Sequence, residues 1–231
     1  MKRLILKKLV IISQKNEEAR TIEFDDRLTV ITGDNPSGET KNRTGKSLVM
    51  KSIYYSLGAK LKKYTTNWDS LQISTIVTFL YDGIKYELYR DRNSFILRSD
   101  DEVKFFASIS ELKKFYVDFF EFYLKMPIKK DDENSVYAYP GAIFMPFYID
   151  QDKGWSGSWD SFSDVFTGKW KPEILLYHMG VRTREYYDLL DEKVELENEQ
   201  KENKRQLKTY EAVIKKHTEK YKDYLDLNLN T

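Results

Sequence analysis

The feature that most constrains this sequence is the tripeptide Gly45-Lys46-Ser47, which stands between a β-rich stretch and a helical pattern. Residues 28–32, LTVIT, are apolar and β-branched and predict a buried strand. Residues 47–57 carry apolar side chains at helical spacing, and Gly58 predicts the end of that helix. The order of strand, glycine-containing loop and helix predicts an α/β domain whose loop can hold a phosphate group.

The chemistry of such a loop can be compared with the sequence position by position. Backbone N–H groups at the start of the helix must point at the phosphates, and Gly45 leaves room at the tightest point. Lys46 would reach the β- and γ-phosphates, and the hydroxyl of Ser47 would bind Mg²⁺. The spacing G-x-x-x-x-G-K-[ST] asks for a glycine where this chain has Thr40. We expect ATP and Mg²⁺ here, and the alternative is a structural turn beside a lysine.

Residues 40–47, TKNRTGKS, resemble G-x-N-G-x-G-K-S, the phosphate loop of ABC ATPases of the structural-maintenance-of-chromosomes (SMC) and SbcC type. Asn42 and the G-K-S end match that pattern, whereas Thr40 and Arg43 replace glycines. The stretch 33–35, GDN, resembles the start of the same loop, which suggests an insertion between strand and loop. The resemblance implies a nucleotide-binding set of Asn42, Arg43, Thr44, Gly45, Lys46, Ser47 and Leu48.

The same resemblance implies a second half of the site after another apolar stretch. Residues 142–149, AIFMPFYI, predict a strand, in which Pro146 indicates an irregularity or an edge. The stretch runs into DQD, and the resemblance implies that Gln151 is the Q-loop glutamine, which helps to bind Mg²⁺ and positions the attacking water. One alternative is that Asp150 is a Walker B carboxylate holding Mg²⁺. Another is that Gln151 is an ordinary loop residue.

The composition changes at about residue 184, after which Glu, Lys, Gln and Asn dominate without Gly or Pro. With Tyr186 as a heptad a position, most a and d positions are apolar or aromatic, and the pattern strengthens after Leu207. This predicts a coiled coil, and a single surface helix is the alternative. The chain is thus predicted to have two domains. Residues 1–180 form an ABC-ATPase-like lobe with a mixed sheet and helices, and residues 184–231 form a coiled-coil helix.

Hydrophobic periodicity and turn residues predict further elements in the first domain. They are strands at 4–13 and 21–24, a β meander at 72–97 with a D-G turn, a helix at 110–125 with Ser110 as its N-cap, and a short helix at 172–179 ended by Gly180.

The composition also limits the chemistry. The 231 residues include no cysteine, which excludes disulfides, cysteine-ligated zinc and thiol catalysis. His178 and His217 are too few and too far apart to suggest a metal site or a catalytic triad, so we interpret both as structural. Lys and Arg total 38 against 37 Asp and Glu, and the net charge of +1 gives no global basic field for nucleic acid.

One cluster of aromatic and basic residues is a candidate DNA contact. Trp155 and Trp159 lie in a Gly/Ser/Asp-rich loop, close in sequence to Lys153 and to Lys169-Trp170-Lys171. Aromatic side chains beside basic ones can stack on bases while the cations contact phosphates. The alternative, which is the more common arrangement, is that these aromatic rings fold back onto the domain.

The apolar run at the N-terminus is broken by Lys7-Lys8, and no small-residue cleavage site follows, so we predict no signal peptide. No stretch approaches the ~20 apolar residues of a membrane span. We therefore expect a cytoplasmic protein without membrane contact.

The resemblance implies a function as well as a fold. ATP and Mg²⁺ would bind at Lys46 and Ser47, and Gln151 would sense the γ-phosphate. A second head or a C-terminal lobe would supply the signature motif, which we do not find in this sequence, nor do we find an apolar strand ending in Asp-Glu. We therefore expect a fragment or one half of a split ATPase. ATP would join two heads, hydrolysis would release them, and the coiled coil would pass that change to DNA or a partner.

Proteins of this family act in DNA repair, chromosome organisation and bacterial anti-phage defence, and the altered loop favours the defence type. Two alternatives remain at this point. One is a stand-alone P-loop kinase or NTPase that uses Asp150 as its Walker B carboxylate and the tail as a dimerisation helix. The other is a non-catalytic coiled-coil interaction protein whose phosphate loop has lost its function.

Overall fold

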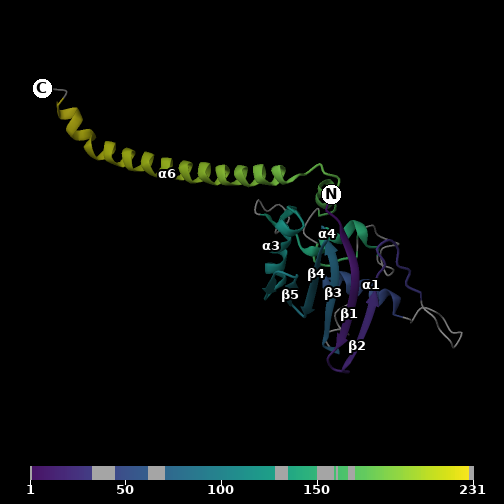
Figure 1. The fold of residues 1–231 in the computed structure, drawn as a ribbon. Helices are drawn as coiled ribbons and strands as arrows, with labels where there is room; N and C mark the ends of the chain where they lie inside the picture. The colour runs from purple at the N-terminus through teal and green to yellow at the C-terminus, as the bar shows by residue number, and fades with distance from the viewer. Residues whose placement is uncertain are drawn as a thin grey trace. The chain divides into compact units, whose positions relative to one another are not determined.

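The computed structural model describes residues 2–32, 45–61, 71–127, 135–149, 159, 161–165 and 170–228, with side chains up to residue 222. The chain divides into two compact units, Met1–Val181 and Arg182–Thr231. The first unit contains a sheet and helices, and the second contains the long helix α6 (Arg184–Asn228) (Figure 1).

The first unit is built on a six-stranded sheet in the order β2-β1-β3-β4-β5-β6 (Figure 1). Its strands are β1 (Leu4–Ser13), β2 (Glu18–Glu23), β3 (Ile73–Tyr81), β4 (Ile84–Asp91), β5 (Ser94–Arg98) and β6 (Val103–Phe106). The α/β class is confirmed in its coarse form, a domain built from a sheet and helices. The pairings among the described strands are all antiparallel. A mixed sheet, as predicted, also contains parallel pairs, and the described strands form none.

Helices and a second, two-stranded sheet complete the first unit. They are α1 (Lys46–Ser56), α3 (Ile109–Phe119), α4 (Pro140–Phe144), the 3-10 helix η2 (Met145–Phe147), α5 (Trp170–His178), and the strands β7 (Lys125–Pro127) and β8 (Ser135–Tyr137).

The register of the strands shows which face of the sheet carries the core. Leu9 of β1 lies opposite Val77 of β3. Val77 also lies opposite Leu88 of β4, and Leu88 lies opposite Leu97 of β5. All four side chains are buried. Because successive side chains of a strand point to opposite faces, this row defines the core face.

The next row on the core face brings α1 and α3 onto the sheet. Arg90 of β4 lies opposite Phe95 of β5, which lies opposite Phe106 of β6. Arg90 contacts the ring of Tyr55 on α1, and Phe106 contacts the ring of Phe115 on α3. Both helices therefore cover the same face of the sheet.

Several sequence predictions of elements are confirmed. β1 has the predicted bounds, and the meander at 72–97 comprises β3, β4 and β5. Asp82 and Gly83 have φ angles of 52° and 82°, as a two-residue D-G hairpin turn requires. Gly58 follows α1 with a φ of 92°, a conformation that glycine adopts without strain. The edge strand β6 and the pair β7 and β8 were not predicted.

The predicted helix at 110–125 is partly wrong in its bounds. α3 begins at Ile109, and its N-cap is Ser108 rather than Ser110. The hydroxyl of Ser108 accepts the backbone N–H of Glu111 at 3.3 Å, and the carboxylate of Glu111 accepts the backbone N–H of Ala107 at 2.9 Å. This reciprocal arrangement resembles a capping box, which fixes where a helix begins.

The strand predicted at 142–149 is wrong, because α4 and η2 occupy residues 140–147. Pro140 stands in the first turn of α4, where its fixed φ suits a helix and its missing N–H costs no hydrogen bond. A short apolar run fits a buried strand and a buried helix equally well. The chain becomes extended only at Tyr148, which has φ −132° and ψ 121°.

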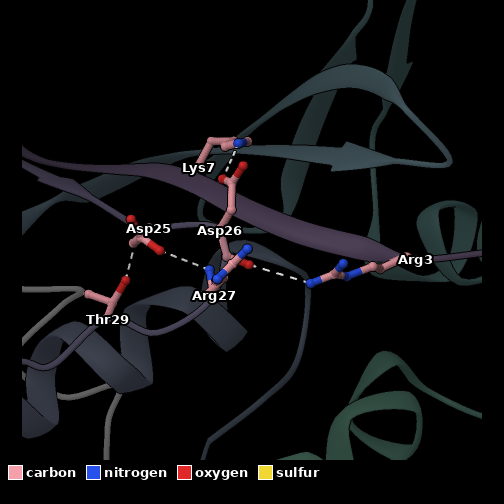
Figure 2. Close-up of polar contacts among 6 residues, drawn as sticks. All are labelled: Arg3, Lys7, Asp25, Asp26, Arg27 and Thr29. Carbon is pink, nitrogen blue, oxygen red and sulfur yellow. Dashed lines mark hydrogen bonds and ion pairs between the residues drawn. The ribbon is translucent and has the colours of Figure 1, made fainter.

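After β2 the chain turns through a set of short polar contacts (Figure 2). The carboxylate of Asp25 accepts the backbone N–H of Arg27 at 2.9 Å. The hydroxyl of Thr29 accepts the backbone N–H of Asp25 at 2.8 Å. Lys7 of β1 donates to the carboxylate of Asp26 and forms an ion pair with it. These contacts hold residues 24–29 in a turn.

The buried strand predicted at 28–32 is also wrong. Residues 28–32 are not assigned to any strand, and Leu28 and Val30 are 75% and 71% exposed. A strand needs a partner for its backbone groups, and β1 is already paired on both sides, by β2 and by β3. None of the described strands pairs with residues 28–32, so their local β preference is not sufficient to form a strand here.

Candidate nucleotide site

The most distinctive backbone conformation in the candidate site is that of Gly45, the N-cap of α1. Its φ of 78° and ψ of 2° lie in the left-handed region, which favours glycine. A Cβ atom at Gly45 would meet nothing within 4 Å, so the backbone conformation rather than lack of space selects glycine here. The carbonyl of Gly45 accepts the N–H of Val49 at 3.1 Å, which opens the helix.

Lys46 and Ser47 are the first two residues of α1, and both are half-buried. No acidic residue occupies the first turn of the helix, so the positive end of its dipole is not neutralised by a carboxylate in that turn. A helix N-terminus of this kind favours an anion. Leu48, predicted as part of the nucleotide-binding set, is exposed. Asn42, Arg43 and Thr44 lie outside the described residues.

The structure describes the second half of the predicted site only up to Ile149. Asp150 and Gln151 lie outside the described residues. The segment that leads to them ends at Tyr148 and Ile149. The ring of Tyr148 is buried and lies 4.5 Å from the ring of Tyr54 on α1. The structure therefore brings the chain just before Gln151 onto the helix that begins with Lys46.

At the opposite end of α1, the buried guanidinium of Arg90 binds backbone carbonyls. Its guanidinium donates to the carbonyls of Tyr55 and Ala59 at the end of the helix, and to the carbonyl of Arg92 at 2.8 Å. Its Cζ atom lies 3.6 Å from the centre of the Tyr55 ring. Burial lowers the pKa of Arg90, and the negative end of the helix dipole favours its charged form.

A returning segment is attached beside this end of α1. Leu61 and Phe162 form an antiparallel bridge, and the N–H of Ser163 donates to the carbonyl of Lys60 at 2.7 Å. The carboxylate of Asp164 accepts the N–H of Lys60 at 3.2 Å. Burial raises the pKa of Asp164 to about 6. Arg90 and Asp164 line one cavity of about 670 Å³, and the charge of the arginine limits that rise.

Sequence reasoning missed both Tyr54 and Arg90 as residues that position α1. The sequence does contain a signal for Arg90. It follows Leu88 by two positions and therefore points to the core face of β4. A cation at a core position of a strand indicates a specific partner. The sequence contains no such signal for Tyr54, because its partners are 90 or more positions away.

The aromatic cluster considered as a DNA contact, and the histidines interpreted as structural, are partly described. Trp155 lies outside the described residues, Trp159 is half-buried, and Trp170 is buried at the start of α5. The ring of Trp170 is thus unavailable for stacking on a base. The Nε2 atom of His178 contacts the carbonyl of Ala142 at 2.9 Å, and burial lowers the pKa of this histidine.

Within the described ranges, no group of three or more His, Asp or Glu side chains is placed to hold a metal ion. No helix in the same ranges has the length and apolar character to cross a membrane.

Comparison with known proteins identifies the family. The AAA domain family matches residues 3–227 of the chain. A Lamassu protein LmuB of Bacillus cereus (strain VD014) is 29% identical over 202 residues, which are 85% of this chain and 34% of that protein. A Lamassu protein LmuB of Bacillus sp. strain NIO-1130 is 32% identical over 148 residues, which are 64% of this chain and 24% of that protein. The chain therefore spans about a third, or less, of the length of these curated relatives. Because the match covers nearly the whole chain, the chain belongs to the AAA domain family, as an SMC/SbcC-like ATPase.

Proposed function

We propose that this chain binds ATP and Mg²⁺ at the N-terminus of α1, as part of an SMC/SbcC-like ATPase. The observation that carries this proposal is the left-handed Gly45 immediately before a helix that opens with Lys46 and Ser47. This conformation aims the first N–H groups of α1 at one point outside the helix, where a phosphate group would sit.

Each residue of the proposed site has a distinct task. The lysine of the helix start would neutralise the β- and γ-phosphates, and the serine hydroxyl would be a ligand of Mg²⁺. Arg43, where the family pattern has glycine, adds a guanidinium that fits a phosphate in two-pronged fashion. Asn42 and Thr44 complete the loop. Gln151 would complete the Mg²⁺ shell and position the attacking water.

The alternative assignment of Asp150 as a Walker B carboxylate has lost its main support. That assignment required an apolar strand directly before the aspartate. Residues 140–147 form α4 and η2 instead, and the chain is extended only at Tyr148. The Q-loop assignment of Gln151 was also based on a strand before the glutamine, and it now rests on the order of parts in the family alone.

We propose that a complementary lobe covers apolar side chains that are exposed on and near α1. Leu48 and Met50 on α1 are exposed, and so are Leu28, Val30, Phe147 and Ile149. Met50 and Phe147 also line a cavity of about 720 Å³, together with residues of β1 and of the segment 24–31. Exposed apolar side chains beside a cavity mark a surface that another part of a protein buries. The greater length of the relatives leaves room for such a lobe in the same polypeptide.

We propose that α6 pairs with another helix as a coiled coil. A helix of its 45 residues is about 68 Å long at 1.5 Å per residue. Its predicted a and d positions include the exposed residues Leu189, Leu196, Leu207, Tyr210, Ile214 and Tyr221. Charged residues outside the a and d positions form i,i+4 ion pairs, such as Lys215 with Glu219. An apolar seam with charged flanks is typical of a helix that has a partner.

Of the settings in which the family acts, we propose anti-phage defence rather than DNA repair or chromosome organisation. The similarity to two Lamassu LmuB proteins supports this choice. DNA remains a proposed partner of the assembled machine, reached by a local basic patch, because the chain as a whole has a net charge of only +1.

Titration calorimetry with ATP and Mg²⁺ tests the proposed site directly. The protein is expected to bind ATP, and Lys46→Ala is expected to weaken binding at least ~30-fold, because a charge-assisted contact to phosphate is worth about 2–3 kcal/mol. Lys85→Ala is the control, since Lys85 is an exposed lysine on β4, away from the site. An affinity unchanged by Lys46→Ala would contradict the proposal.

A further inference from the structure

The cavity that Arg90 and Asp164 share is a second candidate for a binding site. Its volume is about 670 Å³, within the range of pockets that hold small molecules. It is lined by the end of α1 and the segment after it, by the turn between β4 and β5, by Ile109 and Tyr139, and by residues 163 and 164. The residues proposed to bind ATP lie at the beginning of α1, so the proposed function does not use this cavity.

Cations outnumber acidic groups in the lining of this cavity. Lys60, Arg90 and Arg92 line it, and Asp164 is the only acidic residue in the same lining set. Lys60 and Arg92 are exposed. None of the ion pairs among the described residues involves either of them. A cavity with this balance of charge favours an anionic ligand.

The buried guanidinium of Arg90 is held in one orientation. Its Nε atom donates to the carbonyl of Arg92, and its Nη1 atom donates to the carbonyls of Tyr55 and Ala59. The C-terminal end of a helix disfavours an anion, and these bonds offset that effect at the end of α1. The Nη2 atom takes no part in the bonds to carbonyls and carries two N–H groups, so it can donate to a ligand.

The turn between β4 and β5 holds an arginine in a strained backbone conformation. Residues 92 and 93 form a two-residue hairpin turn, because Asp91 is paired with Ser94. Arg92 has a φ of 51°, in the left-handed region where such turns favour Asn, Asp or Gly. Strain of this kind clusters at sites where it serves a function. The arginine at this position therefore indicates that its side chain is used.

The charged groups of the cavity lie at different depths. Lys60 and Arg92 are exposed, whereas burial around Asp164 is deep enough to raise its pKa to about 6. The carboxylate of Asp164 accepts the N–H of Lys60 at 3.2 Å, and a carboxylate has about four acceptor sites. It can therefore accept a further hydrogen bond from a ligand. A matching ligand has an anionic group at the exposed cations and a hydroxyl or amino group at the carboxylate.

We propose that this cavity binds a phosphate monoester whose body carries hydroxyl or amino groups, as nucleoside monophosphates and sugar phosphates do. Lys60 and Arg92 hold the phosphate, because Arg and Lys give charge-assisted hydrogen bonds to phosphate oxygens. Asp164 accepts a hydrogen bond from the body of the ligand, and Arg90 donates to it. This site is separate from the one proposed at Lys46.

Titration calorimetry on the full-length polypeptide carrying Lys46→Ala tests the site, because this change removes the proposed ATP site. The probes are AMP, ribose 5-phosphate and inorganic phosphate, titrated at constant ionic strength. We expect AMP or ribose 5-phosphate to bind on the order of tenfold more tightly than inorganic phosphate, since the body adds hydrogen bonds. The tighter of the two esters distinguishes a nucleotide from a sugar phosphate.

Two substitutions in the same background test the residues. Lys60→Ala and Arg92→Asn are each expected to weaken binding of the ester on the order of tenfold, because each removes a charge-assisted contact. Asn adopts the left-handed conformation readily, so Arg92→Asn is expected to keep or raise Tm while affinity falls. The matched control is Arg98→Ala, at an exposed arginine of β5 that is not among the lining residues. Its affinity is expected to be unchanged.

Three results would overturn the inference. The first is no binding of either ester, or binding no tighter than that of inorganic phosphate. The second is equal affinity in Lys60→Ala, Arg92→Asn and Arg98→Ala, or a loss of affinity in Arg92→Asn that is accompanied by a loss of Tm. The third is binding of a short DNA duplex, weakened by Lys60→Ala and Arg92→Asn, without binding of either ester. Failure of the wild type to bind ATP would overturn the proposed function alone.

Discussion

Asp164 allows a prediction of how the stability of the protein depends on pH. Its carboxylate accepts the N–H of Lys60 and lies against Gly141. Burial raises its pKa from 3.8 to about 6, and backbone amides and the charge of Arg90 keep the rise from being larger. The folded state therefore holds a proton on this group over a range of pH in which the unfolded state has lost it.

The direction of the pH dependence follows from this proton. Between pH 3.8 and about 6 the folded state binds more protons at Asp164 than the unfolded state does, so the free energy of unfolding falls as pH rises through that window. One pKa unit corresponds to about 1.4 kcal/mol, so the full rise amounts to about 3 kcal/mol. Above pH 6 that stabilisation is absent, and the protein holds a buried carboxylate at a cost.

Asp164→Asn removes the charge and keeps an oxygen that can accept the N–H of Lys60. The new amide hydrogens need partners, so we expect a net gain of about 1–2 kcal/mol at pH 7.5 rather than the full 3. For a domain of this size that corresponds to a rise in Tm of about 3–6 °C. The gain is expected to shrink as pH falls below 6.

Thermal unfolding at constant ionic strength between pH 4.5 and 8 measures both effects. Asp118→Asn, at an exposed carboxylate of α3, is the matched control and is expected to leave Tm nearly unchanged over the range. A difference between Asp164→Asn and wild type that does not vary with pH would refute the reasoning. So would a variant that is less stable than the wild type at pH 7.5.

Two further substitutions test the packing around α1. Arg90→Met is expected to cost about 3–5 kcal/mol in the free energy of unfolding, measured in urea, because it removes a buried cation and its hydrogen bonds to the carbonyls of Tyr55, Ala59 and Arg92. A loss below 1 kcal/mol would contradict its role. Gly141→Ala is expected to destabilise by about 2 kcal/mol or more, because the new Cβ would lie 2.3 Å from Oδ1 of Asp164 and 3.1 Å from Cβ of Phe162. A Tm within 2 °C of the wild type would show that this site relaxes around the added methyl group.

The sequence correctly predicted those elements whose conformation is determined by residues adjacent in the chain. The meander follows from alternating apolar residues and from Asp82-Gly83, whose conformation is fixed by the turn itself. Gly45 was predicted as the tightest point before a helix, and its left-handed backbone agrees with that. The roles assigned to Lys46, Ser47 and Gln151 stay predictions, because no bound nucleotide tests them.

The failures came where neighbours distant in sequence decide the structure. Residues 142–149 have the apolar content of a strand, and the deciding signal, Pro140, stands just before them. Residues 28–32 have β preference, but no free strand edge among the described residues accepts them. In the sequence, Tyr54 is only one more aromatic residue in the pattern of an amphipathic helix. Only the fold shows that it touches Phe147, 93 positions later.

Helix α1 is held at its beginning, middle and end by three different contacts. Gly45 sets the N-terminus, Tyr54 anchors residues 147 and 162, and Arg90 closes the C-terminal carbonyls. Buried side chains are packed nearly as densely as organic crystals, so a small displacement of a helix is passed on to the groups that it touches. A nucleotide that moves the start of α1 would therefore also act on Phe147 and Phe162, which contact Tyr54. Met50, an exposed apolar residue of α1, lies one turn before Tyr54 on the same side of the helix, and both residues line one cavity. We thus expect a covering lobe that contacts this cavity to sense the nucleotide through a displacement of α1.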